Sequence, residues 1–196
     1  MVVLVGGAVL GWSLRLEPGS DTFYVATATL AVVWTLGAVA SGPLHPGRIP
    51  RDSTHARPVV APILLALLLA AVFVVGGLVV REIEVPDRQV RSVLDFADRG
   101  SIPLLLVITI VNGIAEELFF RGAAFAAIPR HPVAWTTLAY FVATPATGNV
   151  MLAFAAILLG LLCGLQRRAS GGVLAPILTH VTRSVTMLFA LPAIFG

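Results

Sequence analysis

One apolar stretch of membrane-spanning length carries two adjacent carboxylates. Residues 101–126 read SIPLLLVITIVNGIAEELFFRGAAFA, in which Glu116, Glu117 and Arg121 are the charged side chains. About 20 mostly apolar residues are enough for a helix to cross a bilayer. A charged side chain inside such a helix costs about 2.5–3.5 kcal/mol on insertion scales, so a carboxylate there is a functional candidate by default. The stretch therefore predicts a transmembrane helix that carries part of a functional site.

The composition of the whole chain is that of a membrane protein. Of its 196 residues, 58% are hydrophobic and 12% are charged, and the mean hydropathy is +0.95. Soluble domains carry about 25% charged residues. A soluble enzyme, a nucleic-acid-binding protein and a disordered tail are therefore excluded as descriptions of the whole chain. The net charge of +3 is no sign of nucleic-acid binding, and a single cysteine, Cys163, excludes a disulfide framework.

Apolar runs bounded by charges, Pro or Gly predict the other spans. We expect transmembrane helices over residues 22–41, 58–80, 101–126, 133–147, 149–166 and 172–193, and a short first span over 2–13. The last four of the long runs contain polar groups, so we expect the function to lie there. The predicted fold is all-α, a polytopic transmembrane helical bundle of about six to seven spans. It forms a single integral-membrane domain over residues 1–196.

The positions of the arginines predict the orientation, because short cytoplasmic loops are enriched in Arg and Lys. Three loops that the spans place on one side contain Arg48, Arg51 and Arg57 (42–57), Arg130 (127–132), and Arg167 and Arg168 (167–171). We take that side as cytoplasmic. Loop 81–100 contains four arginines but also five acidic residues, and we expect it to form an amphipathic surface segment on the other side.

The two adjacent carboxylates have different neighbours on a helix. Glu117 and Arg121 are four residues apart with the acid first, the order that favours an ion pair within one helix. Glu116 is rotated about 100° away from that pair and needs a partner from another helix. A carboxylate with no cation in its own helix suits the role of a general base.

His180 is the histidine that lies inside a predicted span, whereas His45, His55 and His131 lie in polar loops. Counted from the predicted cytoplasmic end at 1.5 Å per residue, both Glu116 and His180 lie roughly 12–15 Å deep. We therefore expect these two side chains to meet. Thr144 reaches a comparable depth from a neighbouring span. The alternative is a structural polar clamp that only locks the helices together.

These residues form part of a recognisable pattern. Glu116, Glu117 and Arg121 match an EExxxR motif inside a span, and His180 follows in a Gly-Gly-x-x-x-Pro-Ile-x-x-His run. Over about residues 58–193 the chain resembles the CPBP family of intramembrane proteases (CAAX protease and bacteriocin-processing, also called Abi).

That family also carries an FxxxH motif and an HxxxN or HxxxD motif on further helices. In this sequence Pro145 stands where the histidine after Phe141 is expected, and Ser184 stands where Asn or Asp is expected after His180. The second motif is therefore incomplete and the third is half present.

The resemblance implies that peptide bonds are hydrolysed within the membrane. It implies roles for four residues: Glu116 activates water, Glu117 and Arg121 hold the site together, and His180 stabilises the oxyanion or assists the water. A catalytic zinc takes three protein ligands, which would use both glutamates and His180 and leave no separate base. We therefore expect no cofactor, with zinc as the alternative by family analogy.

The leading prediction is a bacterial plasma-membrane endopeptidase of the CPBP type, with a cavity open to the cytoplasmic side. Its partners would be a peptide or protein substrate in the membrane and the lipid bilayer, with no nucleic acid and with the oligomeric state left open. The alternative is a catalytically inactive relative that serves as a membrane scaffold or partner-binding subunit, because Pro145 and Ser184 depart from the family motifs. A proton-coupled carrier is a weaker third reading, since inverted repeats and broken helices are not evident.

Overall fold

The computed structural model describes residues 1–51 and 54–196 of the chain. The elements in chain order are α1 (Val2–Ser13), α2 (Asp21–Val39), β1 (Ile49–Arg51), β2 (Thr54–Ala56), α3 (Val60–Val80), α4 (Glu84–Arg99), α5 (Ile102–Glu117), the π-helix η1 (Leu118–Ala124), α6 (Phe125–Ala127), α7 (Pro132–Ala143), the 3-10 turn η2 (Pro145–Thr147), α8 (Val150–Ser170) and α9 (Leu174–Phe195). Apart from the short antiparallel hairpin β1–β2, these elements are helical. The predicted all-α bundle is confirmed.

Five of the described helices are long and apolar enough to cross a membrane: α2, α3, the continuous segment Ile102–Ala127, α8 and α9. Helices α1 and α7 are apolar but shorter, at 12 residues each. The chain is therefore a multi-pass membrane protein.

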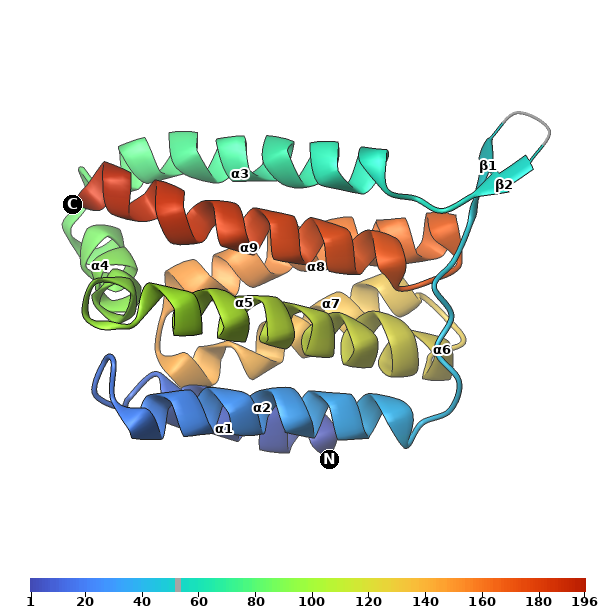
Figure 1. Cartoon of the computed structure of the whole chain (residues 1–196), viewed down its shortest axis with the longest axis horizontal. Helices are drawn as coiled ribbons and strands as arrows, with labels where there is room; N and C mark the ends of the chain where they lie inside the picture. Colours follow the sequence, from blue (N-terminus) through green and yellow to red (C-terminus); the bar gives the residue numbers. More distant parts are fainter. Residues whose placement is uncertain (52–53) are drawn as a thin grey trace.

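The helices run side by side, and most of them lie along the long axis of the molecule (Figure 1). Helix α9 packs against α3, α5 and α8, while α7 packs against α8 and α1 against α2. Helix α9 is thus a central element, with α5 on one side and α3 on the other (Figure 1). A polar side chain on α9 can therefore reach α5 without facing lipid.

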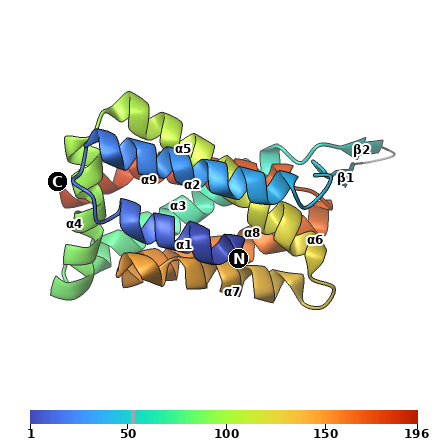
Figure 2. The ribbon, with the colours of Figure 1, turned by 90° about the horizontal axis from the view of Figure 1, so that it is seen from below.

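The two ends of the bundle differ. The β1–β2 hairpin, the α6–α7 loop and the α8–α9 turn lie together at one end, as predicted for the three arginine-bearing loops (Figure 1). Backbone hydrogen bonds join the segment before β1 to the α8–α9 turn, among them Arg48 N to the Ser170 carbonyl at 2.8 Å and Val173 N to the His45 carbonyl at 2.9 Å. At the other end α4 lies across the bundle (Figure 2), with Leu94 and Phe96 buried. The amphipathic segment expected in loop 81–100 is this helix.

Two predicted helix ends differ from the observed ones. The span expected over 133–147 ends as an α-helix at Ala143, because a 3-10 turn follows over Pro145–Thr147. The span expected over 149–166 continues to Ser170, so Arg167 and Arg168 lie in the last turn of α8 rather than in a loop. Gly171 ends that helix in the left-handed conformation at φ 69°, which glycine adopts without strain.

An aromatic cluster fixes α5 and η1 against α2. The Trp34 ring lies 5.0 Å from both Phe119 and Phe120, measured between ring centroids, and all three side chains are buried. Such rings contribute about 0.5–1.5 kcal/mol per pair beyond the area they bury. This packing holds the segment that carries the carboxylates in a fixed rotation relative to the bundle.

Candidate active site

The predicted ion pair between Glu117 and Arg121 is present and fully enclosed. Arg121 Nη1 donates to Glu117 Oε1 at 3.0 Å, and both side chains are 0% exposed. Breaking a buried pair by removing one partner leaves an uncompensated charge. The two residues therefore form a structural unit at the base of the site.

A π-helical turn begins directly after Glu117, where the sequence predicts one uninterrupted α-helix. Residues Leu118–Ala124 form this turn, which contains Arg121. Two contacts with α8 hold it: Arg121 Nη2 donates to the Gly160 carbonyl at 3.2 Å, and Arg167 Nε donates to the Arg121 carbonyl at 2.7 Å. Short π-helical segments occur frequently at functional sites. Tertiary hydrogen bonds of this kind are not visible in the local sequence.

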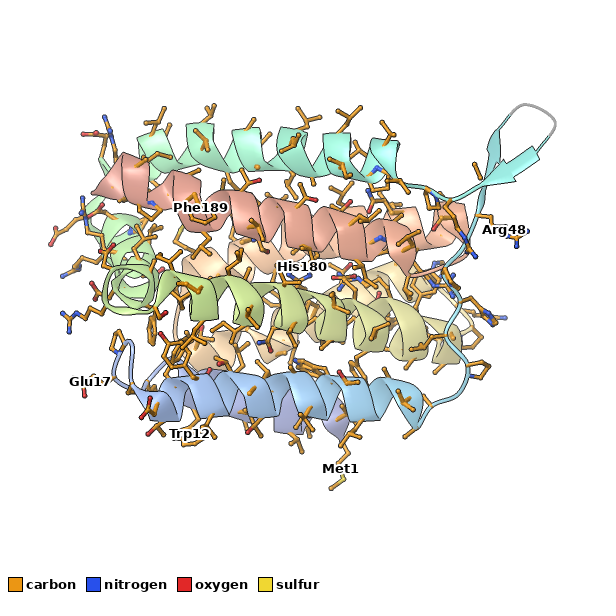
Figure 3. The ribbon with its side chains drawn as sticks, viewed as in Figure 1. Met1, Trp12, Glu17, Arg48, His180 and Phe189 are labelled. Atoms are coloured by element: carbon orange, nitrogen blue, oxygen red, sulfur yellow. The ribbon has the colours of Figure 1, made fainter. Side chains whose placement is uncertain are left out.

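His180 connects α9 to this pair. Its Nδ1 lies 2.8 Å from Glu117 Oε1, and Figure 3 shows the side chain inside the bundle between α9 and α5. An ionised carboxylate only accepts hydrogen bonds. Nδ1–H is therefore the donor, and Glu117 orients the ring as the carboxylate partner of a catalytic histidine does. The other ring nitrogen, Nε2, is 4.0 Å from Glu116 Oε2.

Glu116 finds its partner on another helix, as predicted. The hydroxyl of Tyr140 on α7 donates to Glu116 Oε2 at 2.7 Å. The Glu116 side chain is 14% exposed, whereas Glu117 is 0% exposed. The Glu116 carboxylate is thus partly accessible, whereas that of Glu117 is not.

A cavity of about 150 Å³ lies in front of Glu116. Its polar lining consists of Glu116, Tyr140, Thr144 and Arg183, and its apolar lining includes Trp34 and Leu159. Thr144 was expected at the depth of the site, and it lines this cavity. A water or a substrate group in the cavity would contact the accessible carboxylate.

Tyr140 is the site residue that the sequence analysis did not identify. Thr137, Tyr140 and Thr144 are spaced at i, i+3 and i+7, so they lie along one face of α7. A polar stripe of this kind inside an apolar helix was the available signal. The 5.0 Å distance from the Arg121 guanidinium to the Tyr140 ring centroid adds a cation–π contact to that face.

The other residues singled out in the sequence lie elsewhere or make no hydrogen bond in the site. His131 precedes α7 in the left-handed region at φ 54°. Pro145 lies in the 3-10 turn after α7. Within the described part of the chain, Ser184 makes no side-chain hydrogen bond, although it lies one turn after His180.

Zinc is the alternative cofactor by family analogy. A catalytic zinc needs three protein ligands, and residues 1–51 and 54–196 contain no group of three or more His, Cys, Asp or Glu side chains placed to hold a metal. Glu117 Oε1 is already shared by Arg121 and His180. Glu116 and His180 have the groups needed to take a proton from a water and to stabilise a developing negative charge.

Comparison with known proteins gives a family match. No curated protein and no solved structure matches the chain. Residues 98–186 match the model of the family described as Rce1-like, type II CAAX prenyl endopeptidase Rce1-like. The matched segment includes Glu116, Glu117, Arg121 and His180, and it supports a membrane protease-like role. Residues 98–186 are thus similar to the Rce1-like family, and the resemblance of the chain to the CPBP family is confirmed.

Proposed function

We propose that this protein is an intramembrane endopeptidase that hydrolyses peptide bonds with a water activated by Glu116. The observation that supports this function is the position of Glu116 in a cavity wall, with one oxygen held by Tyr140 and the imidazole of His180 beside it. The substrate would be a peptide segment of a membrane-associated protein in a bacterial plasma membrane.

The chemistry follows the usual course of general base catalysis. Glu116 takes a proton from a water while the water oxygen attacks the carbonyl carbon of the peptide bond. A tetrahedral oxyanion forms. When the carbon–nitrogen bond breaks, Glu116 returns the proton to the leaving amine, so the carboxylate is regenerated.

We infer that His180 stabilises the oxyanion. Glu117 holds the Nδ1–H end of the ring, which leaves Nε2 on the side of Glu116. Donation to an oxyanion needs a proton on Nε2 as well, so the ring is charged at that stage. Glu116 holds the proton at that stage, so the charges of the oxyanion, the Glu117 carboxylate, the Arg121 guanidinium and the imidazolium sum to zero, which reduces the cost of burying them.

The test is hydrolysis of a fluorogenic peptide library by the detergent-purified protein. The Glu116→Gln variant should fold normally and lose cleavage by about 100-fold or more, since general base catalysis contributes about 10²–10⁴-fold. The matched control is Glu82→Gln, because the Glu82 side chain is 70% exposed and pairs with Arg81; its cleavage rate should equal that of the wild type.

Three outcomes separate the alternatives. A fully active Glu116→Gln protein would exclude this residue as the base. Loss of activity with a zinc chelator in the wild type would support a metal mechanism instead. A folded wild-type protein that binds peptides but cleaves none would favour the scaffold or partner-binding role.

A further inference from the structure

A separate and larger cavity lies at the arginine-rich end of the bundle. It has a volume of about 470 Å³ and lies between the start of α7 and the end of α8. Its lining includes Phe125, His131, Val133, Leu161, Leu165 and Arg168. None of its lining residues belongs to the cavity in front of Glu116. This α7–α8 groove is therefore distinct from the candidate active site.

The wall that α8 contributes to the α7–α8 groove changes from apolar to cationic along its length. Leu161, Leu165 and Arg168 are spaced at i, i+4 and i+7, so they follow one face of the helix, and the arginine is in the last turn. Leu161 is 41% exposed and Leu165 is 55% exposed. At 1.5 Å per residue, Leu161 lies about 10 Å deeper than Arg168. The wall below the arginine therefore faces the hydrocarbon of the membrane.

The cationic end of the groove lies at the level of the lipid headgroups. Trp135 is in the first turn of α7, and its side chain is 55% exposed. Tryptophans on the outside of membrane proteins are enriched at the interface between hydrocarbon and water. The α6–α7 loop, which contains His131, lies at the same end of the bundle as the last turn of α8 (Figure 1). A lipid phosphate is therefore available at the height of His131 and Arg168.

Arg168 pairs with no carboxylate in the part of the chain that the structure describes. Its neighbour Arg167 is engaged, because it donates to the Arg121 carbonyl and its guanidinium lies 5.2 Å from the Phe125 ring centroid. The described acidic residues outside the candidate active site lie in or beside the α1–α2 loop and α4, at the opposite end of the bundle (Figure 1). An anionic partner for Arg168 therefore has to come from outside the described chain.

We propose that the α7–α8 groove binds an anionic phospholipid, with the phosphate on Arg168 and His131 and an acyl chain along Leu161 and Leu165. A guanidinium presents a planar fork of N–H donors that binds phosphate oxygens in a bidentate way. The imidazole adds another N–H donor. Because the wall below Arg168 faces hydrocarbon, a ligand that reaches the guanidinium from the membrane carries an acyl chain.

A lipid in this groove connects two elements that hold the candidate active site. His131 directly precedes α7, which carries Tyr140. Arg168 is on α8, whose Arg167 binds the Arg121 carbonyl. A ligand that binds only the folded state raises the stability of that state. We therefore expect the anionic lipid to raise the thermal unfolding temperature of the protein.

The test is a titration of the delipidated, detergent-purified protein with phosphatidylglycerol, followed by native mass spectrometry and by thermal unfolding. Phosphatidylcholine with the same acyl chains is the comparison lipid, because it carries the phosphate without a net negative charge. The first phosphatidylglycerol should bind at least about tenfold more tightly than phosphatidylcholine and should raise the unfolding temperature. Arg168→Gln should remove this preference, because the charge-assisted hydrogen bonds to the phosphate are lost. Arg168→Lys should keep part of it.

The matched control is Arg130→Gln, which removes the same charge from the α6–α7 loop at a residue that does not line the groove. It should leave the preference for phosphatidylglycerol unchanged. A second pair of variants tests the apolar wall. Leu165→Gln should weaken the binding of phosphatidylglycerol, whereas Leu138→Gln should not, because Leu138 is 45% exposed on α7 but lies outside the groove.

Several results would overturn the proposal. Equal affinity for the two lipids, or an unchanged preference in Arg168→Gln, would show that the groove holds no anionic lipid. Equal losses in Arg130→Gln and Arg168→Gln would mean that the charge of the whole end attracts the lipid. Inorganic phosphate that raises the unfolding temperature as much as the lipid does would show that the apolar wall contributes nothing. No measurement in this test uses cleavage, so its failure leaves the proposed peptidase function standing.

Discussion

Tyr140 places its hydroxyl on the carboxylate that we assign as the base, so Tyr140→Phe tests the site by removing one atom. Hydrogen bonds to charged groups contribute about 1.5–3 kcal/mol, and we expect kcat to fall by about 10–100-fold with KM little changed. The phenyl ring keeps its packing against Phe120, at 5.0 Å between centroids. The variant should therefore still fold, with a thermal unfolding temperature lowered only by the loss of this hydrogen bond. Wild-type kcat in this variant would show that Tyr140 does not position Glu116.

Arg121 is predicted to act on stability rather than on chemistry. Arg121→Ala leaves Glu117 buried without its cation, which should lower the free energy of unfolding by roughly 3–5 kcal/mol. The matched variant is the double substitution Glu117→Gln, Arg121→Met, which removes both charges and should destabilise the protein less than the single change. Denaturant titration in mixed micelles measures both. Equal or smaller destabilisation by Arg121→Ala would contradict a stabilising ion pair.

Spacing within one helix was enough to predict the Glu117–Arg121 contact, because neighbours at i and i+4 lie on one face. The equal depth of Glu116 and His180 in the membrane was enough to predict that these residues lie near each other. The closer partner of His180 is nevertheless Glu117, at 2.8 Å against 4.0 Å for Glu116. The rotation of α5 relative to α9 determines which of the two glutamates contacts His180, and packing across the bundle sets that rotation.

At the scale of elements, length and hydropathy predicted where helices lie, but not their internal geometry. The π-helix Leu118–Ala124 is held by hydrogen bonds to α8 that involve Gly160 and Arg167, and those partners are far away in the sequence. Helix α4 is a second element whose geometry depends on tertiary contacts. Its ragged apolar pattern indicated a surface segment, while its position across the end of the bundle depends on contacts with α8 and α9.

Gly160 is where α7 and α8 approach closely at the site. A Cβ there would lie 3.0 Å from Thr137 Cγ2 and 3.4 Å from Arg121 Nη2. We expect Gly160→Val to push the guanidinium from the Gly160 carbonyl and to lower both stability and activity, with a loss of about 1–3 kcal/mol from overpacking.

The matched control for this prediction is Gly76→Ala in α3. A Cβ at Gly76 would meet nothing within 4 Å, and alanine is favoured over glycine in a helix by about 0.5–1 kcal/mol. This variant should therefore be as stable as the wild type or more so, as measured by thermal unfolding. Destabilisation equal to that of Gly160→Val would show that any side chain added to a span of this protein is harmful.

On the scale of the whole molecule, the surface agrees with a protein that lipid surrounds. Large apolar side chains on α3, such as Leu64, Leu68 and Val79, are 61–62% exposed. In water such a face would be an aggregation or interaction site, whereas hydrocarbon is its natural solvent. The charges of Glu116, Glu117, Arg121 and Arg183 lie inside, and most other charges lie at the two ends.

The asymmetry of those ends leads to the last prediction. The end of the bundle that carries Arg48 contains six arginines, two of them in the last turn of α8, whereas Glu17 lies at the opposite end (Figure 3), where acidic residues are common. Positively charged loops stay in the cytoplasm, so Glu17 should face outward and Arg130, in the α6–α7 loop, inward.

Single cysteines at these two exposed positions test this orientation. They are placed in a Cys163→Ala background, which removes the buried native thiol. A membrane-impermeant maleimide should label Glu17→Cys in intact bacterial cells and Arg130→Cys only after permeabilisation, when both sites label equally. The reverse pattern would mean an inverted protein, and labelling of both sites from outside would contradict the transmembrane arrangement itself.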